Sequence, residues 1–153
     1  MGTNYYLMTD KKEIAEKLFE EYTLTDTPFW GYELHIAKCS AGWLPLFHFY
    51  RNFSSVSEIL KNIKENNLRI FDEYERELSL DDFIETVVNH NGGVKGKIKP
   101  RKTGNEIYKN SPFFDPDMPD YIPVSHFDYA HGKYADRYIK DSKGYEFCPE
   151  DFC

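Results

Sequence analysis

Two apolar segments on either side of a glycine-containing break constrain the fold of this 153-residue chain more than any other feature. In residues 32–36, apolar side chains alternate with Glu33 and His35, which is the period of a half-buried strand. A second apolar segment, 44–50, follows the break at 39–42. This arrangement predicts an antiparallel β-hairpin.

The register of the hairpin decides which side chains share a face. Pairing about a two- or four-residue loop puts one apolar set on the same face: Tyr32, Leu34, Ile36, Phe47 and Phe49. The same pairing puts the other set on the opposite face: Glu33, His35, Leu46 and His48. Both loop lengths give this result, because they shift the register by an even number of residues. We therefore predict one apolar face and one face that carries both histidines.

Three amphipathic helices are expected beside the hairpin. Asp10, Ser55 and Ser79 have the residue types that cap helix N-termini, and Glu13 and Glu58 complete capping boxes after the first two. The apolar stripes that follow are Ile14, Leu18, Phe19 and Tyr22; Val56, Ile59, Leu60 and Ile63; and Leu80, Phe83, Ile84 and Val87. We expect the first helix over residues 11–22, and the other two to start at Ser55 and Ser79.

Further strand patterns are interspersed with these helices. Residues 3–8 read as a strand, and segments 69–72 and 75–78 bracket a turn. The order predicts an α+β fold, in which a small antiparallel sheet of hairpins packs with about three helices, rather than a doubly wound parallel sheet. The length fits a single domain, 1–153, with its α+β core in residues 1–91.

The charge of the chain is unevenly distributed. The formal net charge is −7, yet residues 94–109 hold six Lys or Arg side chains and one Glu. Glycines and a proline interrupt this stretch, so we expect a solvated loop over 92–110. Because the rest of the chain is acidic, nucleic acid is not the expected partner. The basic side chains of the loop could still contact a phosphate group, and the sequence does not decide this.

Residues 111–153 combine ten aromatic residues with five prolines. Prolines at this density interrupt regular strands and helices, so we expect an irregular arm. Ten aromatic side chains are too many to leave in water, so the arm should pack on the core or on a second subunit. A homo-oligomer is therefore left open.

The expected compartment is a reducing cytoplasm. No apolar run approaches the roughly 20 residues that a membrane-spanning helix needs, so we expect no membrane contact. The first residues lack the basic start and apolar stretch of a secretory signal. Three cysteines in such a chain are expected to be free thiols.

The polar face of the hairpin is one candidate site. His35, His48 and Glu33 are candidate catalytic residues, because a histidine near a carboxylate titrates near neutral pH and can transfer protons. The same residues also suit an ordinary polar sheet face. The two interpretations remain open at this point.

The turn between the two strands is a second candidate. Lys38 supplies a cation, Gly42 permits a positive φ, and Trp43 offers a face for stacking. The predicted ligand-binding set is Tyr5, Tyr6, Lys38, Ser40, Gly42 and Trp43. Such a set suits a phosphate and a base, although no standard nucleotide-binding spacing occurs. The alternative is a tight turn whose tryptophan caps the core.

Soft metal ligands are present but poorly spaced. They are Cys39, Cys148, Cys153, His126 and His131. Their spacings match no zinc-finger pattern, and the acids at 115, 117 and 120 lack the glycine of a calcium loop. We therefore expect neither a metal site nor a cofactor, and the sequence favours a non-enzymatic role.

Two motifs resemble a group of small bacteriophage-encoded proteins of uncharacterised function. The chain opens with Met-Gly-Thr-Asn-Tyr-Tyr, as members do, and residues 35–43 resemble their His-Ile-Gly-Lys-Ser-Ser-x-Gly-Trp segment. The segment at 70–74 and the aromatic residues at 144–152 follow in the same order. Ala37 and Cys39 stand where the group has Gly and Ser, and the Cys-x-x-Cys of many members has no counterpart here.

The resemblance implies a phage origin and action in the cytoplasm of an infected bacterium. Small phage proteins of this kind are commonly accessory factors that interfere with host machinery or defence. We expect stoichiometric binding of a nucleotide-derived immune signal or of a host defence protein. The alternatives are a small nucleotide-processing enzyme that uses His35, His48 and Glu33, and an acidic decoy for a nucleic-acid-binding protein.

Overall fold

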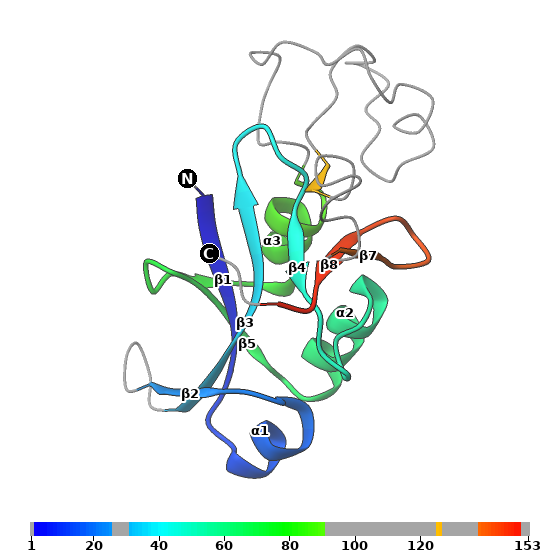
Figure 1. Cartoon of the computed structure of the whole chain (residues 1–153). Helices are drawn as coiled ribbons and strands as arrows, with labels where there is room; N and C mark the ends of the chain where they lie inside the picture. The colour runs from blue at the N-terminus through cyan, green and yellow to red at the C-terminus, as the bar shows by residue number, and fades with distance from the viewer. Residues whose placement is uncertain (1, 26–30, 91–124, 127–137, 151–153) are drawn as a thin grey trace, which may run out of the picture.

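A computed structural model describes residues 2–25, 31–90, 125–126 and 138–150. Within these ranges the chain has an α+β fold, with three helices and an eight-stranded sheet (Figure 1). The helices are α1 (Lys12–Leu18), α2 (Val56–Glu65) and α3 (Leu80–Phe83), the last of which continues as a π-helical turn, η1 (Ile84–Val88). The predicted fold class is confirmed.

The sheet is mixed rather than wholly antiparallel. Its strands are β1 (Gly2–Thr9), β2 (Thr23–Thr25), β3 (Gly31–Ser40), β4 (Leu46–His48), β5 (Arg69–Asp72), β6 (Glu77–Leu78), β7 (Ile139–Lys140) and β8 (Glu146–Cys148). They lie in the order β6-β5-β1-β3-β4-β8-β7, and β2 also pairs with β3. Every pairing is antiparallel except that of β4 with β8. Hairpin patterns alone did not reveal this long-range parallel contact.

Helices α2 and α3 begin as predicted. The Ser55 hydroxyl accepts a hydrogen bond from the Glu58 N–H at 3.1 Å, and the Ser79 hydroxyl accepts one from the Asp82 N–H at 3.1 Å. The side chains of Val56, Ile59 and Ile63 are buried, as the stripe requires. Local capping chemistry and packing therefore agree at both helix starts.

Helix α1 is shorter than predicted, and its predicted cap is wrong. The helix ends at Leu18, and its N-cap residue is Lys11, whose side chain makes no capping bond. Phe19 is extended and buried in the core, and the chain then enters β2, which pairs with β3. Burial of Phe19 and strand pairing thus override the helical pattern over residues 19–22.

A β-bulge in β3 sets the orientation of the central hairpin. Tyr5 of β1 pairs with Ala37, but the next residue, Tyr6, pairs with His35, so Ile36 is an extra residue. Ile36 and Ala37 are both fully buried in the core. The bulge changes the alternation of β3, because two consecutive side chains face the same side.

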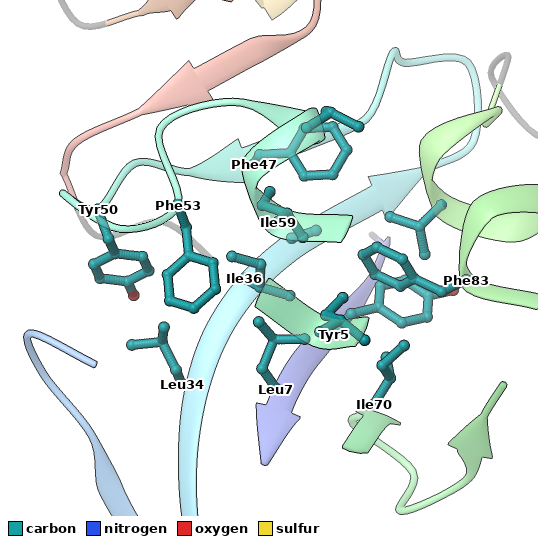
Figure 2. Close-up of a cluster of buried hydrophobic side chains, with 14 of the residues drawn as sticks. Tyr5, Leu7, Leu34, Ile36, Phe47, Tyr50, Phe53, Ile59, Ile70 and Phe83 are labelled. Atoms are coloured by element: carbon teal, nitrogen blue, oxygen red, sulfur yellow. The ribbon is translucent and has the colours of Figure 1, made fainter. Parts of the chain in front are cut away.

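The two sides of the sheet differ, and we call them the core face and the second face. The core face packs against α2 and α3, and Figure 2 shows Ile59 and Phe83 from these helices beside Leu7 and Ile36 from the sheet. Four other buried hydrophobic residues lie outside this cluster and belong to the second face: Met8, Leu46, Phe71 and Cys148. Both sides of the sheet therefore contain buried side chains.

Part of the C-terminal arm is regular, which corrects the expectation of an irregular arm. Residues 139–148 form the β7–β8 hairpin, and β8 is inserted between β4 and β7. Tyr145 and Phe147 join the core cluster, where the Phe147 and Phe47 rings stack with centroids 5.3 Å apart. No proline lies between 123 and 149, which leaves room for these strands. The remainder of the predicted arm lies outside the described residues, except for 125–126, 138 and 149–150.

Asp141 joins this hairpin to α2. One carboxylate oxygen accepts hydrogen bonds from the N–H groups of Lys143 and Tyr145, at 3.0 and 2.9 Å. The other accepts one from the N–H of Val56, the first residue of α2, at 3.0 Å. The hairpin is therefore attached to the core by a helix cap as well as by strand pairing.

The predicted basic loop, 92–110, lies outside the described residues. In the part of the chain that the structure describes, no helix has the length and apolar character needed to cross a membrane.

Candidate functional site

The turn between β3 and β4 has the backbone that the sequence predicted. Gly42 has a φ of 85°, in the left-handed region that favours glycine. The Trp43 N–H donates a hydrogen bond to the Ser40 carbonyl at 3.1 Å, which closes the turn. A substitution at Gly42 would strain this backbone and move Trp43.

Two histidines hold the carbonyl groups on either side of this turn. His90, which follows η1, bonds to the Ser40 carbonyl through Nε2 at 3.0 Å. His126 bonds to the Leu44 carbonyl through Nε2 at 3.1 Å. A carbonyl oxygen only accepts, so each Nε2 carries a proton. The turn is therefore anchored by two distant segments of the chain.

The indole of Trp43 stacks on the imidazole of His126. The ring centroids are 4.7 Å apart with an interplanar angle of 26°, and the Tyr138 ring lies 6.0 Å beyond His126. Burial and, to a smaller extent, the charge of Lys38 lower the pKa of His126 to about 4, against the opposing effect of the Leu44 hydrogen bond. His126 is therefore neutral at pH 7, and its Nδ1 is a hydrogen-bond acceptor.

Lys38 lies on the second face, between Asn4 of β1 and Leu46 of β4 in the sheet register. Its side chain is half-buried, and its charge is close enough to His126 to affect the imidazole. The structure thus brings Lys38, Trp43 and His126 together. We call these three residues and the turn 40–44 the turn site.

The two tyrosines of the predicted set do not act together in this site. Tyr5 lies on the core face opposite Ala37, where burial raises its pKa to about 12. Tyr6 lies on the second face, with its ring centroid 5.2 Å from that of His35. Successive residues of a strand point to opposite faces, so Tyr5 is separated from the turn site by the sheet.

Ser40 has a structural role at the start of β1. It pairs with Gly2, where any Cβ atom would overlap the Ser40 hydroxyl and the Cys39 carbonyl. Glycine at position 2 therefore allows β1 to begin directly against β3. The Ser40 carbonyl also accepts the two hydrogen bonds that hold the turn.

His35 and His48 share the second face, as predicted. Their ring centroids lie 6.0 Å apart, and Phe47 lies on the core face. The register differs from the expected one, because Lys38 rather than His35 is opposite Leu46. A register difference of three residues would by itself put His35 and His48 on opposite faces of the sheet. The extra residue at Ile36 shifts the alternation of β3 by one, so the two histidines share a face after all.

The surroundings of His48 favour packing over catalysis. Its side chain is 4% exposed, and its ring stacks on Tyr50 with centroids 4.3 Å apart and an angle of 7°. Glu33 is half-buried, which raises its pKa, and its charge contributes to the raised pKa of Tyr6. A substrate would have little access to His48 in this arrangement.

The soft metal ligands that the structure describes are dispersed. Cys39 lies on the core face, where its thiol approaches the Val87 carbonyl at 4.0 Å, and Cys148 lies on the second face. Burial raises the pKa of Cys39 to about 12. Among the described residues, no group of three His, Cys, Asp or Glu side chains is arranged for a metal ion. His131 and Cys153 lie outside the described residues.

Sequence reasoning missed Glu146 and underestimated His126. Glu146 is 1% exposed, and it accepts hydrogen bonds from the Ser125 hydroxyl and from the His126 N–H, the latter at 2.8 Å. The alternation of Tyr145, Glu146 and Phe147 was a strand signal, but it was read as part of an irregular arm. The pairing of His126 with Trp43 has no local sequence signal.

Comparison of the chain with models of protein families, with curated proteins and with solved structures finds no match.

Proposed function

We propose that this protein is a phage accessory protein that binds a nucleotide-derived immune signal of the host stoichiometrically at the turn site. It would act against host defence in the cytoplasm of the infected bacterium. The observation that carries this proposal is the anchored turn, in which a lysine lies beside a tryptophan stacked on a neutral histidine.

The chemistry of the turn site suits a ligand with both an anionic group and a planar ring. The Lys38 ammonium can pair with a phosphate, while the indole of Trp43 offers aromatic surface to a base. Because His126 is neutral, Lys38 supplies the positive charge among the three side chains that define the site. A ligand with one or two phosphate groups matches this charge better than a polyanion does.

The burial of His48 favours binding of a ligand over its chemical conversion. His48 is buried under Tyr50 and His35, so it is poorly placed to exchange a proton with a bound molecule. Glu33 and His35 remain on the second face, and an enzyme that uses them is the alternative that the experiment must separate from capture.

The experiment combines calorimetry with recovery of the ligand. Purified protein is titrated with adenosine monophosphate, cyclic dinucleotides and adenosine diphosphate ribose, and the complex is then denatured and its small molecules identified by mass spectrometry. We expect one of these compounds to bind with a fixed stoichiometry and to be recovered unchanged. A converted product would support the enzyme, and binding of none of these compounds would contradict the proposal.

A matched pair of lysine variants tests the location of the site. Lys38→Ala should weaken binding about tenfold, the effect of losing roughly 1.4 kcal/mol, which is close to the lower end of the range for a hydrogen bond to a charged group. Lys61→Ala removes an exposed lysine from α2 and should leave binding unchanged. Equal effects of the two substitutions would exclude the turn site.

A further inference from the structure

A buried carboxylate lies behind the stacked rings of the turn site. Glu146 of β8 is opposite Leu46 of β4 in the parallel pairing, which puts it on the second face. Ionisable side chains are rarely so fully buried unless hydrogen bonds compensate for the lost water. The compensating groups described here are the Ser125 hydroxyl and the His126 N–H.

These two hydrogen bonds hold the short segment 125–126 against the sheet. From this position the His126 side chain reaches the Leu44 carbonyl and stacks on Trp43. The contacts run in an unbroken order from the carboxylate through the backbone of His126 to its ring and to the indole. Each of them is within hydrogen-bonding or ring-stacking distance.

We propose that Glu146 is a positioning residue, which acts through residues 125–126 to hold His126 against Trp43 and so forms one wall of the turn site. Its role in ligand binding rests on the proposed function, whereas its effect on the two rings does not. The turn site is then built from residues 38–44 and from residues 125–126, which Glu146 of β8 holds in place.

The proposal is testable through the fluorescence of Trp43 without any ligand. Trp30→Phe leaves Trp43 as the single tryptophan, since the chain has two. A protonated imidazole in contact with an indole quenches its emission, so a pH titration reports the protonation of His126. We expect a midpoint near pH 4, where burial and the Lys38 charge place the pKa of His126.

Glu146→Leu removes both acceptors, so His126 should leave its buried position and the midpoint should rise toward the ordinary value of about 6.5. Loss of the carboxylate without movement of His126 would leave the midpoint near 4, because burial, the Leu44 hydrogen bond and the Lys38 charge set the pKa of His126. A rise of the midpoint is therefore the sign that Glu146 positions the ring. An unchanged or lowered midpoint would overturn the proposal.

Two further variants keep the test decisive if Glu146→Leu does not fold. Glu146→Gln can still accept from the His126 N–H and can donate to the Ser125 hydroxyl, so its midpoint should stay near that of the parent protein. Ser125→Ala removes one hydrogen bond and should give an intermediate value. Glu65→Leu, at an exposed carboxylate of α2, should change nothing. Circular dichroism at each pH confirms that the protein is folded.

The binding arm uses adenosine monophosphate as the probe. At pH 7 Glu146→Leu should bind adenosine monophosphate more weakly than the parent protein does, because the turn site loses the wall that His126 forms against Trp43. Glu146→Gln keeps that wall and should bind as the parent protein does. If adenosine monophosphate binds neither protein, the proposed function is weakened while the fluorescence still decides the role of Glu146.

Discussion

Both faces of the sheet contain buried side chains, but the two faces are built from different chemistry. The core face is a continuous apolar cluster that includes Phe47, Phe83 and Phe147 and is covered by α2 and α3. The second face mixes aromatic rings with Glu33, His35, Lys38 and other polar groups. Packing of apolar groups dominates the first, and hydrogen bonds and charges shape the second.

Because of this difference, stability can be altered by substitutions on the core face and ligand binding by substitutions on the second face. Substitutions on the core face change the free energy of unfolding through lost contacts and cavities. Substitutions at Lys38 change the charge of a half-buried surface with little loss of packing. The two faces also differ in their titratable groups, which should make them sensitive at opposite ends of the pH scale.

The largest effect is expected from Phe147→Ala on the core face. The ring is fully buried and stacks on Phe47, so we expect the free energy of unfolding to fall by about 3–5 kcal/mol. Urea denaturation measures the change. Ile139→Ala, at an exposed position of the neighbouring strand β7, should cost about 0.5 kcal/mol or less. A similar small loss for Phe147→Ala would show that β8 is not part of the core.

Acid should weaken the second face through His126. Its pKa is about 4 in the folded protein and 6.5 unfolded, so stability is complete above pH 6.5 and is lost as the pH falls toward 4. The full loss is about 3 kcal/mol. Burial raises the pKa of Glu33, so protonation of Glu33 favours the folded state in acid and opposes the effect of His126. The test therefore compares the parent protein with His126→Leu. The variant should lack this part of the acid sensitivity; identical pH profiles would contradict the buried position of His126.

Alkali should weaken the core face through Cys39 and Tyr5. Both groups have a folded pKa of about 12, above the ordinary values of 9.0 and 10.0, so their stabilising contribution is lost as the pH rises above 9. By pH 10 we expect a loss of about 2 kcal/mol, due chiefly to Cys39. Cys39→Ala should delay the loss until Tyr5 begins to titrate. Thermal unfolding between pH 8 and 10.5 measures it, and an unchanged onset in the variant would exclude Cys39 as the cause.

The smallest effect on stability is expected from Lys38→Ala. Lys38 forms no salt bridge with a described residue. A half-buried lysine of this kind contributes little, so the free energy of unfolding should change by about 0.5 kcal/mol or less. Trp43→Ala should lower both stability and ligand affinity, since it removes the stack on His126 as well as the aromatic surface. Melting temperatures and calorimetric titrations of the two variants measure this difference. If Lys38→Ala destabilises as much as Trp43→Ala does, the lysine has a structural role.

Local chemistry predicted much of the fold. Ser55 and Ser79 cap α2 and α3 because a serine hydroxyl reaches the third residue of a helix without help from the rest of the chain. The positive φ of Gly42 and the shared face of His35 and His48 also agreed with the sequence. The agreement for the histidines depended on a bulge that the alternating pattern did not reveal.

The remaining features depend on contacts between distant residues. The end of α1 is decided by the burial of Phe19 and by the pairing of β2 with β3, neither of which follows from helical periodicity. The site residues His126 and Glu146 meet the turn only because β8 pairs with β4. A single sequence gives no signal for which distant strands pair, so this half of the turn site was not predictable.

The parallel pairing of β4 with β8 also sets an order of events during synthesis. Phe147 follows Phe47 by 100 residues, and ribosomes add roughly 5–20 residues per second, so β8 emerges several seconds after β4. Throughout that interval the nascent chain presents an open strand edge and an uncovered phenylalanine, the features that chaperones and neighbouring chains engage. The yield of active protein in a crowded cell is therefore expected to depend on how quickly the last strand reaches the sheet.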